Sequence, residues 1–278
     1  MKPIARALAE AARRLEASSD TARLDAELLM AEALNIDRDR LILAPPDRKV
    51  PERFWAMVER RLAGEPIAYI TGRRGFWNID LHVGPGVLIP RPDSEVLIAA
   101  AIEHFDGAEG PKHILDLGTG PGTLLLAALD IWPQAKGVGV DVSRHALAYA
   151  AANARRLGFD DRAELKLGNW ADSITQRFDL ILCNPPYVAE GADLGPGVRE
   201  YEPGEALFAG AEGLDAYRAL APQLPRLLNP GGLAAIEIGP GQGRSVTDLL
   251  ARDGLRARIA RDFADRPRAV LLTWAATK

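Results

Sequence analysis

The sequence predicts an α/β fold in which a mostly parallel sheet carries helices on both faces and is preceded by a small helical domain. From about residue 112 onward, short apolar segments of strand length alternate with segments of helical pattern, which is typical of such a sheet. In the first third of the chain, apolar residues recur at helical spacing. The 278 residues, 47% of them apolar, suffice for one large domain and one smaller domain.

The first third of the chain has the start and stop signals of helices. Asp20 is predicted to cap a helix that continues to Leu34. Pro51 and Gly64 stand where another helix would begin and end. Residues 1–66 are therefore expected to form a helical N-terminal domain.

The pattern changes after this domain. Residues 69–72 and 76–81 read as short strands broken by glycines, which predicts a β-hairpin linker over residues 67–90. A helix is expected to begin after Pro92. Residues 91–278 are then expected to form the large α/β domain.

The alternating region supplies the elements of the sheet. Strands are expected at 113–117, 137–140, 164–167, 178–183, 233–238 and 269–273, and helices at 123–129, 145–157, 216–228 and 243–252. Ligands of such sheets bind at the carboxyl ends of the strands, beside the point where the strand order reverses. Motifs that directly follow the first, second and fourth strands are therefore the first candidates for a site.

A glycine-rich turn, Gly118-Thr119-Gly120-Pro121-Gly122, follows the first strand, which contains Asp116. Glycines there allow a tight turn and a close approach of the backbone to a ligand. In a dinucleotide fingerprint the third glycine would stand at the position of Thr123, so the spacing favours a ligand without a phosphate. The alternative is a tight strand-to-helix turn that binds nothing.

Asp141 and Trp170, which follow the second and third strands, extend this site. Asp141 follows the second strand, where a carboxylate can accept hydrogen bonds from both ribose hydroxyls of an adenosine. The alternative for Asp141 is an N-cap of the next helix, a role that Ser143 could also fill. Trp170 follows the third strand and could pack against an adenine ring, or be an ordinary half-buried tryptophan.

The tetrapeptide Asn184-Pro185-Pro186-Tyr187 follows the apolar strand 178–183 and carries the chemistry. Two prolines make the loop rigid. The Asn184 side-chain oxygen and the Pro185 carbonyl can each accept one N–H of a planar NH₂ group, so that the nitrogen lone pair is directed at a methyl donor. Tyr187 can cover one face of the target. The alternative is a stiff surface loop in which Asn and Pro favour a turn.

Several motifs together cover almost the whole chain. They are Gly64–Gly72, Leu88–Glu95, Asp116–Gly122, Asn184–Tyr187, Tyr201–Pro203, Glu237–Gly239 and Gly241–Gly243. This set resembles the release factor glutamine methyltransferases, a family of class I S-adenosylmethionine-dependent methyltransferases with a Rossmann-like sheet. The glycine-rich turn and the tetrapeptide are shared with adenine-N6 DNA methyltransferases and some RNA methyltransferases, whereas the Ile89-Pro90-Arg91-Pro92-Asp93 segment is more specific.

The resemblance implies a function and a set of site residues. The enzyme would transfer a methyl group from S-adenosylmethionine, leaving S-adenosylhomocysteine, to the side-chain nitrogen N5 of the glutamine in the Gly-Gly-Gln motif of a peptide chain release factor. Residues 1–66 would dock the protein substrate. The expected cofactor-binding residues are Asp116, Gly118, Thr119, Gly120, Gly122, Asp141, Trp170 and Asn184. The expected substrate-binding residues are Asn184, Pro185, Pro186 and Tyr187, of which Asn184, Pro185 and Tyr187 are expected to be catalytic.

Composition and spacing weigh against other classes of partner. The net charge of -4 and the pI of about 5.7 disfavour stable binding to nucleic acid. No apolar run is long enough to cross a membrane, and the four histidines share no metal-ligand spacing. The lone Cys183 excludes an intrachain disulfide and fits a reducing compartment such as the cytoplasm. A monomer is expected.

Three alternative functions remain open at this point. The first is an amino methyltransferase acting on adenine N6 or guanine N2 of a nucleic acid, which would require a basic face or an added recognition domain. The second is a cofactor-binding scaffold without activity, which would tolerate loss of Asn184. The third is a nicotinamide-dependent oxidoreductase, which Thr123 at the third-glycine position disfavours.

Overall fold

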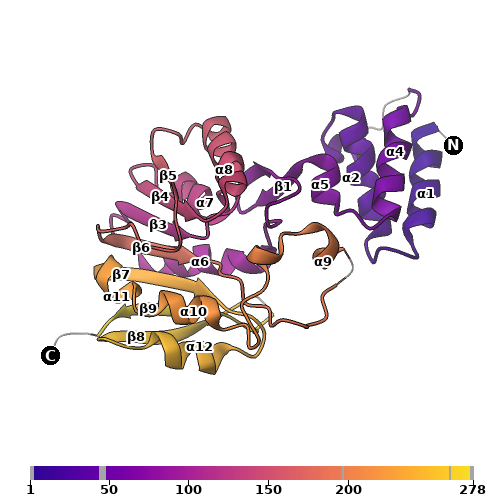
Figure 1. Ribbon diagram of the computed structural model, residues 1–278. Helices are drawn as coiled ribbons and strands as arrows, with labels where there is room; N and C mark the ends of the chain where they lie inside the picture. Colours follow the sequence, from indigo (N-terminus) through magenta and orange to yellow (C-terminus); the bar gives the residue numbers. More distant parts are fainter. Residues whose placement is uncertain (1–2, 44–47, 196, 263, 276–278) are drawn as a thin grey trace. The chain divides into compact units, whose positions relative to one another are not determined.

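The computed structural model describes residues 3–43, 48–195, 197–262 and 264–275. The described chain divides into two compact units, each of which is considered by itself (Figure 1). One unit comprises Met1–Arg73, Val83–Pro85 and Leu194–Tyr201, and the other comprises Arg74–His82, Gly86–Asp193 and Glu202–Lys278.

The first unit is helical, which confirms the predicted N-terminal helical domain. Its helices are α1 (Pro3–Leu15), α2 (Ala22–Leu34), α3 (Arg38–Leu43), α4 (Glu52–Leu62), α5 (Ile67–Thr71) and α9 (Val198–Tyr201). The helices α1, α2 and α4 pack through fully buried side chains such as Ile4, Leu29 and Phe54. The residue that precedes α2 is Thr21, so the predicted cap at Asp20 was placed one position too early.

The predicted strand at 69–72 is wrong, because this segment forms the helix α5. Pro66 precedes its first turn, the Thr71 hydroxyl donates to the Ile67 carbonyl at 2.9 Å, and Gly72 ends the helix at φ +73°. These local helix signals outweigh the β-branched side chains that suggested a strand. A two-stranded sheet follows directly, formed by β1 (Arg73–Phe76) and β2 (Ile79–His82), so the hairpin is shorter than predicted.

The second unit is built on a seven-stranded sheet with the order β5-β4-β3-β6-β7-β9-β8. The strands are β3 (His113–Leu117), β4 (Lys136–Asp141), β5 (Ala163–Leu167), β6 (Phe178–Cys183), β7 (Leu228–Glu237), β8 (Leu255–Arg261) and β9 (Pro267–Trp274). The first five in this order are parallel, and β9 pairs antiparallel with both β7 and β8. The mostly parallel α/β sheet is therefore confirmed.

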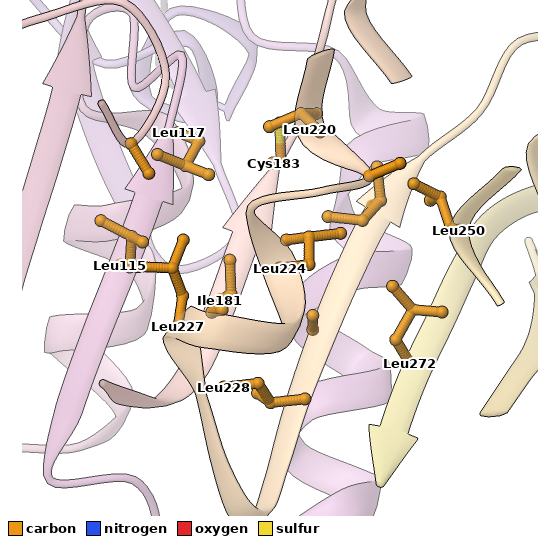
Figure 2. Packing of buried hydrophobic residues seen from close by; sticks show 14 of the residues in the cluster. Leu115, Leu117, Ile181, Cys183, Leu220, Leu224, Leu227, Leu228, Leu250 and Leu272 are labelled. Carbon is orange, nitrogen blue, oxygen red and sulfur yellow. The ribbon is translucent and has the colours of Figure 1, made fainter. Parts of the chain in front are cut away.

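Helices cover both faces of this sheet. They are the 3₁₀ turn η1 (Pro92–Ser94), α6 (Glu95–His104), α7 (Thr123–Ile131), α8 (Arg144–Leu157), the 3₁₀ turn η2 (Gly204–Ala206), α10 (Asp215–Leu220), α11 (Leu224–Leu227) and α12 (Gly243–Leu250). Figure 2 shows Leu224 and Leu227 near Ile181 and Leu115, and Leu220 beside Cys183; all of them belong to one buried cluster. On the opposite face, α7 packs on β3 and β4.

Two predictions within this unit need correction. The helix expected at 216–228 is divided into α10 and α11, because Pro225 lies in the first turn of α11 and cannot continue a helix from α10. The strand β8 was not predicted, because its alternation of arginines with alanine and isoleucine leaves most of its side chains outside the core. As an edge strand it needs only one partner, β9.

The strand order reverses between β3 and β6. The chain runs outward from β3 to β4 and β5 and then crosses to β6 on the other side of β3. A ligand site is expected where these two strands end. Among the described residues, no helix combines the length and the apolar character needed to cross a membrane.

Candidate active site

A cavity lies at the carboxyl ends of β3, β4 and β6. Of the predicted site residues, Asp116, Gly118, Thr119, Gly120, Asp141, Trp170, Asn184 and Pro186 line it. The remaining predicted residues, Gly122, Pro185 and Tyr187, do not contribute to its lining. The lining also includes residues that the sequence did not single out, among them Gly86, Val87, Ala146, Glu205 and Ala206.

The glycine-rich turn presents bare backbone to this cavity. The N–H groups of Gly118 and Thr119 both donate to the Val140 carbonyl, at 2.9 and 3.0 Å, and so join the turn to β4. Gly118 and Gly120 have φ of +73° and +56°, which a residue with a Cβ adopts only with strain. Gly122 instead lets the Leu126 side chain pack against the turn, since a Cβ at Gly122 would lie 2.7 Å from that side chain.

Asn153, which no sequence motif indicated, holds the glycine-rich turn in place. This side chain of α8 is fully buried. Its amide nitrogen donates to the Pro121 carbonyl at 2.9 Å and to the His82 carbonyl at 3.0 Å, while its oxygen accepts from the His82 N–H at 2.8 Å. One side chain therefore joins the turn to β2, and the shape of the turn depends on a residue more than 30 positions away.

Asp116 brings a buried carboxylate to the cavity. Its Oδ2 accepts from the Thr119 hydroxyl at 2.7 Å and from the Leu125 N–H at 3.1 Å. Its Oδ1 is buried and accepts no hydrogen bond from any described residue. Burial raises the pKa of Asp116 to about 7, although the bonds from Thr119 and Leu125 oppose this shift. Asp116 lines the cavity, and a carboxylate with one unpaired oxygen is suited to a cationic group.

Asp141 is oriented by backbone groups rather than by side chains. Its Oδ2 accepts from the Gly120 N–H at 2.8 Å, and its Oδ1 accepts from the Ser143 N–H at 2.9 Å. The helix α8 is capped by Ser143, whose hydroxyl accepts from the Ala146 N–H at 3.2 Å. The capping role is therefore filled, and Asp141 keeps free lone pairs for a ligand that enters the cavity.

Trp170 borders the cavity at the end of the third parallel strand, where the backbone turns. It has φ +49°, an uncommon conformation for a large side chain. The following N–H, that of Ala171, donates to Gln223 at 2.9 Å, which holds this turn in place. A Cβ at Gly118 would lie 3.8 Å from the Trp170 ring, so the ring lies close to the glycine-rich turn.

The loop Asn184–Tyr187 begins where β6 ends and is held at both of its ends. The Asn184 amide nitrogen donates to the Ser94 hydroxyl at 3.1 Å. The Tyr187 carbonyl accepts from the Gln242 side chain at 3.0 Å. Burial raises the pKa of Tyr187 to about 12, and the nearby Glu237 carboxylate adds to this rise. The Tyr187 hydroxyl therefore stays neutral at physiological pH.

The segment before α6 forms a second wall of the cavity. Arg91 and Ser94 line it, and the Arg91 guanidinium donates to Glu202 at 2.5 Å. Glu202 is 5% exposed and also accepts from the Ile89 N–H at 3.1 Å. This ion pair orders the wall, and the motif Leu88–Glu95 was the sequence signal for it. Among the residues described, no group of three or more His, Cys, Asp or Glu side chains could hold a metal ion.

The chain is similar to known proteins over most of its length. Residues 6–72 match a family model described as the PrmC N-terminal domain, and residues 109–251 match one described as a methyltransferase domain. The release factor glutamine methyltransferase of Cereibacter sphaeroides is 45% identical over 95% of this chain and 96% of its own length. That of Rhodospirillum rubrum is 43% identical over 90% of this chain and 78% of its own length. In fold, a methyltransferase structure from Pyrococcus furiosus is similar, with a TM-score of 0.52 at 19% identity, over 78% of this chain and 96% of that chain.

Proposed function

The chain belongs to the release factor glutamine methyltransferases, and from this premise we propose that it methylates the side-chain amide nitrogen of a glutamine in a peptide chain release factor, with S-adenosylmethionine as methyl donor. One observation carries the proposal from the chain's own geometry. A single cavity is lined both by Asp116, whose Oδ1 accepts no hydrogen bond from any described residue, and by Asn184, the residue expected to hold the amide.

The residues at the first end of the cavity fit S-adenosylmethionine. The free Oδ1 of Asp116 suits its ammonium group, and the remaining lone pairs of Asp141 suit its ribose hydroxyls. Gly118 and Gly120 leave space for close approach, and Trp170 offers an apolar face to the adenine. When bound, the cofactor supplies an electrophilic methyl group on a sulfonium centre.

Asn184, which lines the second end of the cavity, and the adjoining Pro185 and Tyr187 of the same loop would hold the glutamine amide. The Asn184 side-chain oxygen and the Pro185 carbonyl each accept one amide N–H, so the lone pair of the nitrogen points along the direction of methyl transfer. Both acceptors also stabilise the positive charge that develops on nitrogen as the new bond forms. Tyr187 stays neutral and is proposed to cover the planar amide. No strong base is needed before attack, because the proton leaves after transfer.

The glutamine of the Gly-Gly-Gln motif, at its N5, is the proposed acceptor. Residues 1–66 are proposed as the docking domain for the release factor, with 67–90 as the linker and 91–278 as the methyltransferase domain. The net charge of -4 supports a protein partner rather than stable binding to nucleic acid. We propose a monomeric enzyme that meets its substrate in the cytoplasm, where translation takes place.

The test incubates the purified chain with labelled S-adenosylmethionine and either unmodified release factor, ribosomal RNA or DNA. We expect one methyl group on the Gly-Gly-Gln glutamine, located by mass spectrometry of the digested release factor. A matched release factor with glutamine replaced by asparagine in that motif should stay unlabelled. Transfer to nucleic acid with none to the release factor would refute the proposed substrate.

A further inference from the structure

A buried carboxylate beside the acceptor end of the cavity does not itself contact the proposed cofactor or the proposed substrate amide. Glu237 is 1% exposed at the end of β7. Because Cys183 pairs with Ile236 in adjacent parallel strands, Asn184 and Glu237 are the next residues along these two strands. The Oε2 atom of Glu237 is buried and accepts no hydrogen bond from any residue that the structure describes.

Ser94 stands between these two residues. Its hydroxyl accepts from the Asn184 amide nitrogen at 3.1 Å, and it lies close enough to the Glu237 carboxylate to lower the pKa of that group. Ser94 is 2% exposed, so water does not compete for its hydroxyl. The three side chains come from segments that are far apart in the chain and meet only in the folded unit.

The direction of these hydrogen bonds follows from the number of protons. An ionised carboxylate can only accept, so the single proton of the Ser94 hydroxyl points at Glu237. The Ser94 oxygen can then only accept from Asn184, which fixes the amide nitrogen toward Ser94. The amide oxygen is thereby left for the cavity, and this is the orientation that the acceptor nitrogen requires.

We propose that Glu237, acting through Ser94, is a positioning residue that sets the orientation of the Asn184 amide. This inference rests on the proposed function, in which the Asn184 oxygen accepts the N–H of the substrate. If Glu237 is protonated it can donate to Ser94, and the Ser94 proton can then bond to the Asn184 oxygen. The Asn184 side-chain amide then flips and presents its two N–H groups to the substrate, where they repel the NH₂ group of the acceptor.

The groups around Glu237 determine when this change occurs. Burial raises the pKa of Glu237 to about 7, against the lowering effect of the nearby Ser94 and Tyr187 hydroxyls and of the charge of Arg268. The titratable and charged groups near its carboxylate are Arg268 of β9, Asp93 of η1, Tyr187 after β6, Cys183 of β6 and Tyr217 of α10. The two tyrosines and the cysteine have raised pKa values and stay neutral at physiological pH. The turnover number should therefore rise with pH through about 7 as Glu237 ionises.

The kinetic test compares Ser94→Ala, Glu237→Gln and the double variant with the wild type at saturating S-adenosylmethionine. Each single change should lower kcat about tenfold, the equivalent of one hydrogen bond, with the Kd of S-adenosylhomocysteine unchanged within about twofold. The double variant should lose no more than the larger single loss, because both residues act through one path. The rise of kcat near pH 7 should be absent from Ser94→Ala.

A matched control uses Thr247 of α12, whose hydroxyl is also buried but has no hydrogen-bond partner among the described residues. Thr247→Val should leave kcat and its pH profile as in the wild type. Additive losses in the double variant, a pH profile unchanged in Ser94→Ala, or a parallel loss of cofactor binding would each overturn the inference.

A second measurement needs no acceptor and so separates this inference from the proposed function. The Asn184 side-chain amide signals of the full-length wild type are followed by ¹⁵N NMR across pH 5.5–8.5. They should shift with a midpoint near 7, and the shift should vanish in Ser94→Ala. Amide signals that do not titrate would refute the positioning role even if the release factor is methylated. If the signals titrate but the release factor is not methylated, only the proposed substrate would be refuted.

Discussion

The two ends of the cavity are held in place in different ways. At the cofactor end, the partners of Asp116 and Asp141 lie no more than 21 positions away in the sequence, and most are backbone N–H groups. At the acceptor end, the partner of Asn184 is the side chain of Ser94, 90 positions away. Backbone groups of nearby segments therefore orient the two carboxylates of the cofactor end, whereas the side chain of a distant segment orients Asn184 at the acceptor end. Substitutions at the cofactor end should alter the affinity for the cofactor, and substitutions at the acceptor end should alter kcat.

The largest effect is expected from Asn184→Ala, which removes an acceptor that acts on the substrate amide. We expect kcat to fall about 100- to 1,000-fold, as when one oriented polar group is removed from a transition-state site. The Kd of S-adenosylhomocysteine, measured by calorimetry, should change by less than about threefold. A comparable loss of cofactor affinity would show that the two ends are not separate.

The second effect is expected from Asp116→Asn at the opposite end. The neutral amide keeps the shape of the side chain but loses the charge that pairs with the ammonium group. Because a hydrogen bond to a charged group contributes about 1.5–3 kcal/mol, cofactor affinity should fall about 10- to 100-fold. Turnover at saturating cofactor should stay within about threefold of wild type. Asp130→Asn on α7, whose carboxylate is exposed, serves as the charge-matched control and should change neither quantity.

The same contrast explains how much of the site could be predicted from the sequence. The glycine-rich turn and Asp141 were readable because each directly follows an apolar strand, and strand ends of a parallel sheet meet at one edge. Asn184 and Pro186 were found at the cavity for the same reason. Their ligand contacts remain predictions.

The supporting residues could not be predicted, because their contacts depend on tertiary packing. Nothing in the neighbourhood of Asn153 in the sequence shows that its amide meets the Pro121 carbonyl. The same holds for Ser94, which reads as a helix-start residue, and for Glu237, which reads as the end of a strand. Elsewhere in the fold, local helix signals produce α5 where a strand was predicted. Pro225 separates α10 from α11, although the apolar spacing had predicted one continuous helix.

A third prediction concerns the pH dependence of stability, because each end carries one buried carboxyl. Burial raises the pKa of Asp116 and of Glu237 to about 7, well above the values in an unfolded chain. Between about pH 5 and pH 7 the folded state then holds protons that the unfolded state has released. The free energy of unfolding without cofactor should therefore fall as pH rises, by up to about 1.4 kcal/mol per pH unit for each group.

Urea unfolding of the free enzyme at pH 5, 6 and 7 checks this slope. Asp116→Asn and Glu237→Gln should each remove a share of it, and the double variant should be nearly independent of pH in this window. If one variant alone abolished the slope, only one of the two buried carboxyls would have a raised pKa. A slope of the opposite sign would contradict the raised pKa at both ends.

The smallest effect is expected from Trp170→Phe, at the border of the cofactor end. Phenylalanine keeps the positive φ of this position and an aromatic face, so that only the larger ring area is lost. Cofactor binding should weaken about threefold, a fraction of what an aromatic contact contributes, with kcat unchanged. Trp132→Phe is the matched control, because Trp132 contacts Phe105 outside the cavity and its loss should leave cofactor affinity as it is. Equal affinities for both variants would mean that Trp170 only packs against the glycine-rich turn, and that the cofactor end is made of backbone and carboxylates alone.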